Sequence, residues 1–206
     1  MINKETKIYC SFSSNPGNNG CIFFNSEFKE LNMNAIYKSF YSDDIKKSIE
    51  AVKILGIKGF ALSMPFKIEA LDYVDEVEDS ARKIGSINTV VNKDGYLKGY
   101  NTDWVGVKKY FEIRRFDSIY IMGNGGFSKA VQYTCDVMGI GFEVITRENW
   151  NILEELEDKI IFNATPVDVN TDNFLIDGRP HTDAGREIAL YQAKEQFKIY
   201  TGVKID

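Results

Sequence analysis

The sequence predicts an α/β fold with two lobes, and three observations carry this prediction. Short apolar runs of strand length alternate with longer segments whose apolar residues recur at helical spacing. A boundary near residues 102–116 separates two such series, and a glycine-rich turn joins a strand to a helix in the second series. We therefore expect one α/β lobe in residues 1–102, a second, shortened lobe in 103–182, and a C-terminal helix in 183–206 that packs back on the first lobe.

The elements of the first lobe follow in order along the chain. Short runs rich in apolar residues predict strands at residues 8–12, 35–40 and 59–63, and helical spacing predicts a helix at 22–31. A second helix is expected to begin after Asp43 or Asp44, which would cap it, and to run to Leu55. Two short strands flank Lys93-Asp94-Gly95, which predicts a hairpin.

The second lobe continues this alternation. Thr102 or Asp103 is expected to cap a helix that runs to Phe111. Residues 118–122, 126–138 and 142–146 form a strand–helix–strand pattern, typical of a βαβ unit. A helix at 152–156 and a strand at 159–162 follow, and a last helix begins near Asp183.

The composition excludes several classes of function. The chain has 206 residues and a net charge of −5, with no sustained basic run, which argues against nucleic-acid binding. It has no apolar stretch of about 18 residues and no apolar signal-peptide core, so we expect no membrane span. Three dispersed cysteines favour reduced thiols in a cytoplasm. The chain has one histidine, His181, which cannot form a metal site with such dispersed cysteines, so we expect no metal.

The turn "GNGGFSKA" at residues 123–130 carries a nucleotide signal. Gly123 permits a tight turn and Gly125 lets the backbone approach a pyrophosphate. N–H groups near Gly126 and Phe127 would supply donors at the positive end of the helix. Ser128 takes the third position of the G-x-G-x-x-G pattern. Two glycines also occur in turns for geometric reasons alone, but the strand–turn–helix context favours a Rossmann-like nucleotide lobe.

The next strand ends in "VITRE" at residues 144–148. In dinucleotide folds an acidic residue at this place holds the ribose 2′-OH, whereas an arginine accepts a 2′-phosphate. Arg147 therefore favours NADP, while Glu148 directly after it keeps NAD open. The alternative is a solvated charge pair after a strand.

An acid/base pair has two candidates, Lys67 at the end of the strand at 59–63 and Asp103 at the start of a helix. Taken singly, each has an ordinary explanation. Lys67 would be a surface lysine with a buried stem, and Asp103 part of a helix cap.

Taken together, several segments resemble the shikimate dehydrogenase family. "ALSMPFK" (61–67) is similar to the family's Asn-Val-Thr-Ile-Pro-His-Lys, and "SINTV" (86–90) to its Ala-Val-Asn-Thr-Val. "GYNTDWVG" (99–106) matches its Gly-x-Asn-Thr-Asp-x-x-Gly, and "NATPVDV" (163–169) follows the glycine turn as in the family. "ALYQAKEQFKIYTG" (189–202) looks like the family's last helix. The resemblance covers nearly the whole chain, and the Asn-Thr-Asp and Pro-x-Lys blocks are its specific parts.

The resemblance implies an enzyme of aromatic amino acid (chorismate) biosynthesis. It would interconvert 3-dehydroshikimate and shikimate, or an analogue such as quinate, with NADP. Moving a hydride off an alcohol carbon requires removal of the hydroxyl proton, and Lys67 and Asp103 would form that acid/base pair. By resemblance, the residues that bind the cyclohexene carboxylate substrate are Asn18, Ser63, Asn88, Asn101, Thr102 and Gln192. The cofactor would contact Gly123, Asn124, Gly125, Gly126, Phe127, Arg147 and Thr165.

Three departures from the family leave alternatives open. The family binds the substrate carboxylate with a Ser-x-Ser-Pro loop and a His-Asn pair, but an ungapped register places Asn18, Gly20 and Cys21 in the loop, and Phe24-Asn25 at the pair. Ser11, Ser13 and Ser14 would serve in a shifted register.

The other departures lie near the lysine and in the second lobe. Phe66 replaces the histidine before the lysine. The chain between Val169 and Asp183 is shorter than in the family, so a homodimer partner would help to cover the small nucleotide lobe. The alternatives are a metabolite-binding paralogue without catalysis, which regulates or acts as a scaffold, and a dehydrogenase of an unrelated polyol or acid.

Overall fold

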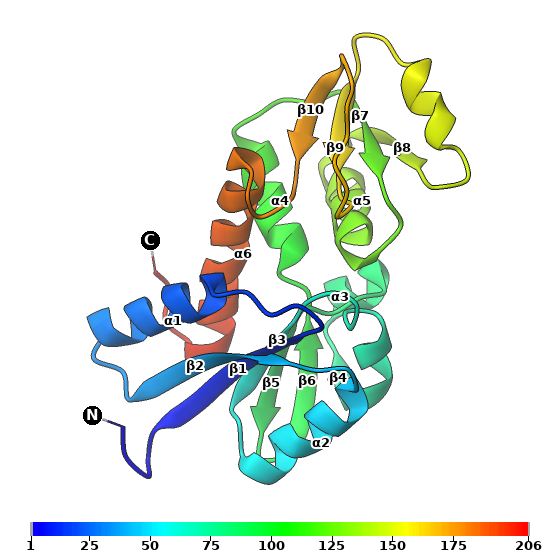
Figure 1. The fold of residues 1–206 in the computed structure, drawn as a ribbon. Coiled ribbons are helices and arrows are strands. Elements are labelled where there is room, and N and C mark those ends of the chain that lie inside the picture. Colours follow the sequence, from blue (N-terminus) through cyan, green and yellow to red (C-terminus); the bar gives the residue numbers. More distant parts are fainter. Residues whose placement is uncertain (1, 206) are drawn as a thin grey trace. The chain divides into compact units, whose positions relative to one another are not determined.

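The computed structural model describes residues 2–205 and divides into two compact units (Figure 1). Unit 1 comprises the chain up to Thr102 and again from Ala193 onward, and unit 2 comprises Asp103–Gln192. Among the helices of residues 2–205, none has both the length and the apolar character needed to cross a bilayer.

A mixed sheet forms the centre of unit 1. Its strands are β1 (Lys7–Ser13), β2 (Ala35–Tyr41), β3 (Gly59–Leu62), β4 (Glu76–Val77), β5 (Thr89–Lys93) and β6 (Tyr96–Tyr100). They lie in the order β2-β1-β3-β5-β6-β4. β1 is parallel to β2 and β3, whereas β5 is antiparallel to β3 and β6. The carboxyl ends of β1, β3 and β6 therefore meet the amino end of β5 at one edge.

Helices cover this sheet: α1 (Asn19–Glu30), α2 (Ile45–Leu55), the short helices η1 (Glu69–Tyr73) and α3 (Asp79–Ile84), and the end of α6 (Asp183–Thr201). Asp44, not Asp43, caps α2, because its carboxylate accepts the N–H of Lys47 at 3.0 Å. Gly56, with a φ of +65°, ends the helix in the left-handed conformation.

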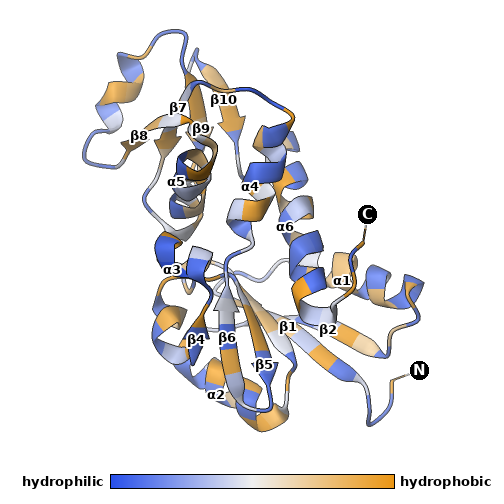
Figure 2. Cartoon of the chain, turned by 180° about the vertical axis from the view of Figure 1, so that it is seen from behind, coloured by the Kyte–Doolittle hydropathy of each residue, from blue (hydrophilic) through white to orange (hydrophobic). Residues whose placement is uncertain are grey.

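Alternation along β1 gives the sheet an apolar layer on each face. Cys10 and Phe12 pack with the buried side of α2, whereas Tyr9, directly before Cys10, points to a second cluster of aromatic residues. Phe197 of α6 is fully buried in that second cluster. Figure 2 shows the corresponding orange bands along the strands and the mixed colouring of α6. The last part of the chain is thus part of the core of unit 1.

Unit 2 is built on a parallel sheet. Its strands are β7 (Ser118–Met122), β8 (Gly141–Ile145), β9 (Ile160–Asn163) and β10 (Phe174–Asp177), in the order β10-β9-β7-β8. Its helices are α4 (Asp103–Glu112), α5 (Gly126–Met138), the 3₁₀ helix η2 (Trp150–Glu154) and the start of α6. Because the strands run the same way, the loops after all of them meet at one carboxyl edge.

The α/β class and the order of the expected elements are confirmed, with some differences in detail. The helix expected at 152–156 is a 3₁₀ helix that starts two residues earlier. The sequence did not predict β10, since it has only a few residues and starts at Phe174, which is 66% exposed. Pairing with β9, from Phe174 beside Ile160 onward, makes it a strand. The short elements β4, α3 and η1 were also not expected.

Candidate active site

Most of the substrate residues expected in unit 1 lie at one edge of its sheet, where β1, β3 and β6 end. The N–H of Ser63, directly after β3, donates to the carbonyl of Phe12 at 3.1 Å. The residue before β5, Asn88, accepts the N–H of Leu62 at 2.8 Å and donates its own N–H to Tyr100 at 3.0 Å. Backbone hydrogen bonds thus hold the segments that carry Ser63, Asn88 and Asn101 side by side.

Lys67 lies in the segment that follows β3. It is half-buried, and its carbonyl accepts the N–H of Ile87 at 2.8 Å, which ties it to the residue before Asn88. Phe66 is buried in the core beside Phe12, while Met64 is 58% exposed. The phenylalanine that stands before the lysine therefore serves the packing of unit 1.

Asn88 is the centre of a buried polar network. It is 3% exposed, and its Oδ1 accepts the N–H of Thr102 and the hydroxyl of Thr89, both at 2.8 Å. Its Nδ2 donates to the Thr102 hydroxyl at 3.0 Å. The neighbouring Asn101, also 3% exposed, donates through Nδ2 to the carbonyl and the hydroxyl of Ser86 at 3.0 Å. These contacts fix the segment that leads directly into Asp103.

The ungapped register gave the carboxylate-binding positions to Asn18, Gly20 and Cys21 and to Phe24-Asn25, which lie at and after the start of α1. Asn18 is exposed just before α1, and its side chain makes no capping hydrogen bond. Asn25 is used internally, since its amide bonds to the backbone of Cys21 and Tyr37 at 2.8–2.9 Å. Ser13 and Ser14 instead lie at the end of β1, with both hydroxyls 3.5 Å from the carbonyl of Met64. These two hydroxyls thus lie beside the segment that carries Lys67, which is the arrangement that the shifted register requires.

The glycine turn forms the carboxyl edge of unit 2 after β7. Gly123 has a φ of +108°, and a Cβ there would lie 3.1 Å from the Thr165 side chain, so a glycine is required. Gly125 precedes α5 with a φ of −84°, and a Cβ there would meet nothing within 4 Å. Ser128 is fully buried, and its hydroxyl donates to the carbonyl of Gly123 at 2.6 Å. The residue at the third glycine position therefore holds the turn closed.

Three further predicted cofactor residues lie around the start of α5. Gly126 is its first residue, and Asn124 is exposed in the turn. The ring of Phe127 packs 5.9 Å from that of Phe162, so its side chain belongs to the core of unit 2 and its backbone faces the turn region. The fit to a phosphate group rests on the backbone N–H groups at the start of a long helix and on the open space at Gly125.

The loop after β8 presents Arg147. The Oδ1 of Asn149 accepts the N–H of Thr146 at 2.6 Å, and the N–H of Asn149 donates back to the Thr146 carbonyl at 3.3 Å. This reciprocal pair closes a turn whose middle residues, Arg147 and Glu148, are both exposed. The sequence did not identify Asn149, although an asparagine three residues after a threonine is a recognisable turn signal.

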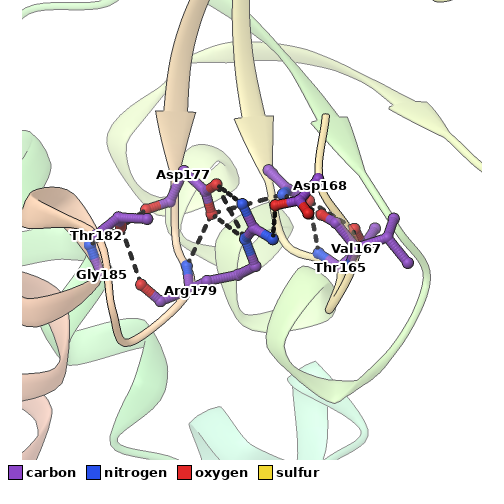
Figure 3. A network of polar contacts seen from close by, with 8 residues as sticks. Thr165, Val167, Asp168, Asp177, Arg179, Thr182 and Gly185 are labelled. Carbon is purple, nitrogen blue, oxygen red and sulfur yellow. Dashed lines mark hydrogen bonds and ion pairs between the residues drawn. The ribbon is translucent and has the colours of Figure 1, made fainter. Parts of the chain in front are cut away.

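The loops after β9 and β10 are tied together by a charged network (Figure 3). The Arg179 guanidinium lies between two carboxylates, with Nη2 2.6 Å from Asp177 and Nη1 2.6 Å from Asp168. Asn163 is fully buried, and its Oδ1 accepts the N–H and the hydroxyl of Thr165 at 2.9 and 2.6 Å. Thr165 is thereby held against Gly123, so the network shapes the wall of the glycine turn.

The charge balance in this network shifts the pKa of Asp177. Partial burial of the carboxyl raises its pKa, but the hydrogen bonds from Arg179 outweigh this effect and hold the pKa below its usual value. The same contacts raise the pKa of Arg179, so both groups are charged at neutral pH. Within residues 2–205, no three His, Cys, Asp or Glu side chains gather as a metal-binding group.

Comparisons with known proteins agree with this arrangement. The family model described as "Shikimate dehydrogenase substrate binding domain" matches residues 20–90. The "Shikimate dehydrogenase-like protein" of Haemophilus influenzae is 42% identical over 134 residues, which cover 64% of this chain and 49% of that relative. The solved shikimate 5-dehydrogenase-like protein HI0607 superposes with a TM-score of 0.82 at 28% identity, covering 100% of this chain and 95% of that one. The chain is thus similar, in sequence and in fold, to members of the shikimate dehydrogenase family.

A second relative in this family is the "Shikimate dehydrogenase (NADP(+))" of Pyrococcus furiosus, which is 42% identical over 141 residues. That alignment covers 65% of this chain and 51% of the relative. The chain thus spans about half the length of these two curated relatives, at 49% and 51%. The resemblance predicted from the motifs is confirmed at the level of the family.

The remaining family positions lie in unit 2. Asp103 is the first residue of α4 and is 6% exposed. Gln192 lies on the half of α6 that belongs to unit 2, where a Cβ at Gly106 would come within 3.0 Å of its side chain. The roles of these two residues, like those of Lys67 and the other site residues, stay proposals.

Sequence reasoning missed the residues that hold the site in place from a distance. Gln196, one turn after Gln192, is 2% exposed and donates to Thr89 at 2.7 Å. Asn163, in the same "NATPVDV" segment as Thr165, holds the loop after β9. Gln196 stands at helical spacing from Gln192, and this spacing is the one sequence signal that marks it.

Proposed function

We propose that the protein is an NADP-dependent dehydrogenase that interconverts 3-dehydroshikimate and shikimate, or a close analogue such as quinate. The observation that carries this proposal is the edge of unit 1. There Ser63, Lys67, Asn88, Asn101 and Thr102 come together. Backbone hydrogen bonds hold Ser63, Lys67 and Asn88 to neighbouring segments, and the Thr102 N–H donates to the Asn88 side chain. Asparagine, threonine and serine groups beside a lysine suit a polyhydroxylated carboxylate substrate.

The carboxyl edge of unit 2 fits a dinucleotide. α5 spans Gly126–Met138, so backbone N–H groups at its start form an anion site, and the space at Gly125 lets a pyrophosphate approach the backbone. Arg147, exposed in the turn after β8, would hold a 2′-phosphate. Thr165 and the backbone at Gly123, Asn124 and Phe127 would complete the cofactor contacts. The P. furiosus relative carries NADP(+) in its name, which supports the choice of this cofactor.

The acid/base roles follow from the chemistry of alcohol oxidation. NADP, when bound, supplies hydride exchange with the alcohol carbon. Lys67 and Asp103 would take up and return the hydroxyl proton. Asn88 and Asn101 would orient the substrate hydroxyls, Gln192 would contact the substrate from α6, and Ser13 and Ser14 or Asn18 would bind its carboxylate.

The activity test follows NADPH absorbance on addition of shikimate, with Lys67→Ala compared with Lys93→Ala. Lys93 ends β5 at the edge opposite Asn88, so it controls for the loss of a lysine from the same sheet. We expect Lys67→Ala to lower kcat about 10²-fold or more and Lys93→Ala to leave it unchanged. Equal activity of the two variants would reject the role of Lys67.

The cofactor test uses Gly125→Ala and Arg147→Ala. A Cβ at Gly125 meets no protein atom within 4 Å, so this variant should fold like the wild type and yet bind NADP about tenfold more weakly. Arg147→Ala should weaken NADP binding and leave NAD binding unchanged. Unaltered NADP affinity in both variants would refute the cofactor site.

The outcomes also separate the alternatives. Binding of shikimate without turnover would indicate a metabolite-binding paralogue, and activity on other alcohols alone would indicate a different dehydrogenase.

A reducing compartment such as the cytoplasm suits the free thiols of Cys10, Cys21 and Cys135.

A further inference from the structure

Asn124 and Gly125 form the most exposed part of the glycine turn in unit 2. Both residues are exposed, and neither belongs to a helix or a strand. Among the hydrogen bonds of residues 2–205, none involves the Asn124 side chain or the Gly125 N–H. A Cβ at Gly125 would meet nothing within 4 Å, so the space around this residue is open. The side-chain amide and the next backbone nitrogen are therefore free to approach each other.

An asparagine followed by a glycine can react with its own backbone. The Gly125 nitrogen attacks the side-chain carbonyl carbon of Asn124 and closes a succinimide ring. The side-chain nitrogen leaves as ammonia and takes the proton of the Gly125 N–H. Water then opens the ring at either carbonyl, which gives aspartate or isoaspartate. The reaction needs only water, and glycine favours it because no Cβ hinders the attacking nitrogen.

The sequence contains a second Asn-Gly pair, Asn19-Gly20, which is held in a different way. These two residues begin α1, so their backbone is helical. A Cβ at Gly20 would lie 3.0 Å from the Tyr37 ring, which shows that this glycine is packed. Helical backbone turns the next nitrogen away from the side-chain carbonyl carbon, so ring closure there requires the end of α1 to open. The same dipeptide thus occurs once in an open turn and once in a helix.

Deamidation of Asn124 would create a negative charge where the proposed function places the cofactor phosphates. The anion site there consists of the N–H groups at the start of α5, from Gly126 onward. A carboxylate at residue 124 lies close to the positive end of this helix, competes for it, and repels a phosphate. Isoaspartate, in addition, lengthens the backbone of the turn by one methylene. Both products should therefore weaken cofactor binding.

We propose that Asn124 is a site of spontaneous deamidation, and that the carboxylate formed there closes the glycine turn to the cofactor. The modification itself depends only on Asn124 and Gly125. The effect on the cofactor rests on the proposed function, since it takes the turn as a phosphate site. A bound dinucleotide would cover Asn124 and protect it, so the modification inactivates protein that has no cofactor.

The first experiment follows deamidation in the purified protein, incubated at neutral pH and analysed by peptide mass spectrometry. We expect conversion at Asn124 to be about tenfold faster than at Asn19, because the reaction at Asn19 must wait for α1 to open. Gly125→Ala, whose Cβ meets no protein atom within 4 Å, should slow the reaction at Asn124 and leave that at Asn19 unchanged. Equal rates at the two asparagines, or an unreacted Asn124, would overturn the proposal.

The second experiment titrates fresh and incubated protein with NADP by calorimetry. Wild type should lose NADP binding in step with deamidation at Asn124, whereas Asn124→Gln, which cyclises far more slowly, should bind alike before and after incubation. Asn124→Asp should bind NADP about tenfold or more weakly than wild type even when fresh. NADP present during incubation should slow conversion at Asn124 and not at Asn19. Full affinity in Asn124→Asp or in deamidated wild type would show that the carboxylate does not close the site.

Failure of the proposed function gives a different result, because fresh wild type would then bind no NADP. The peptide measurement needs no cofactor and still decides whether Asn124 is a modification site. Conversion that is faster at Asn124 than at Asn19 and slowed by Gly125→Ala supports this site, and equal conversion overturns it.

Discussion

Two asparagines at opposite edges of the unit 2 sheet allow a test of what the loop network does. Asn163 is the last residue of β9, at the carboxyl edge, and is fully buried. Its side chain accepts from the Thr165 N–H at 2.9 Å and hydroxyl at 2.6 Å and donates to the Val167 carbonyl at 3.0 Å. Asn173 precedes β10 at the amino edge and makes comparable hydrogen bonds. Its side chain accepts the Lys159 N–H at 2.8 Å and donates to the Leu156 carbonyl at 2.8 Å.

Replacing either residue by alanine should destabilise the fold by a similar amount. Each hydrogen bond contributes about 1 kcal/mol net, and the loop groups left behind are near enough to the surface for water to reach them. We therefore expect a loss of about 2–3 kcal/mol for Asn163→Ala and about 2 kcal/mol for Asn173→Ala, or about 5–10 °C in Tm. Urea unfolding followed by circular dichroism measures both values.

Cofactor binding should separate the two variants. Thr165 is held against Gly123 by Asn163, so Asn163→Ala should loosen one wall of the glycine turn and raise the Kd for NADP about tenfold. Asn173 lies at the other edge, and its variant should bind NADP like the wild type in a calorimetric titration. The reasoning is refuted if both variants change the Kd equally, or if Asn163→Ala loses stability and keeps its affinity.

Two further predictions concern stability. The Tyr200 hydroxyl is buried with no hydrogen-bond partner among the described residues, so Tyr200→Phe should stabilise the protein by about 1 kcal/mol, seen as a higher Tm; a lower Tm would show that the hydroxyl has a partner. Asp177 has a pKa below its usual value, so its contribution to stability is complete above the ordinary Asp pKa of about 4 and is lost as the pH falls through the depressed value. Thermal unfolding across acidic pH should therefore show a shallower fall for Asp177→Asn than for wild type, and parallel curves would contradict this.

The features that the sequence predicted are those fixed by local chemistry. The hairpin at Lys93-Asp94-Gly95 is formed as expected, with φ values of +54° at Asp94 and +94° at Gly95 that suit these residue types. The aspartate cap of α2 and the glycine turn before α5 were also predicted from local residue preferences. Each of these signals lies within a few residues of the structure that it produces.

The features that the sequence did not predict depend on distant partners. β10 becomes a strand through β9, and its Asp177 meets Asn163 from 14 positions away. Gln196 meets Thr89 across 107 positions. No periodicity or turn preference reports such contacts, because they form only when the sheets are assembled. The motif at residues 99–106 placed Asn101 and Thr102 among the expected substrate residues, but gave no indication of the hydrogen bonds that hold Asn88 in place.

The two buried asparagines Asn92, in β5, and Asn88, directly before it, are held in different ways. Asn92 is 6% exposed and bonds to backbone groups, donating to the Ile57 carbonyl and accepting the Gly95 N–H, both at 2.8 Å. These backbone contacts explain the burial of Asn92, which supports the hairpin between β5 and β6. Asn88, at the other end of the same strand, bonds to the side chains of Thr89 and Thr102 as well.

Bonds between side chains make up only about a tenth of the hydrogen bonds in proteins, and a buried network of them requires every member to be satisfied. Such a network stabilises one orientation of the Asn88 amide, because the Thr102 N–H and the Thr89 hydroxyl both donate to its oxygen. The chain of Gln196, Thr89 and Asn88 therefore joins α6 to the residue before β5, and removing one member would leave a buried polar group unsatisfied at a cost of about 1–3 kcal/mol.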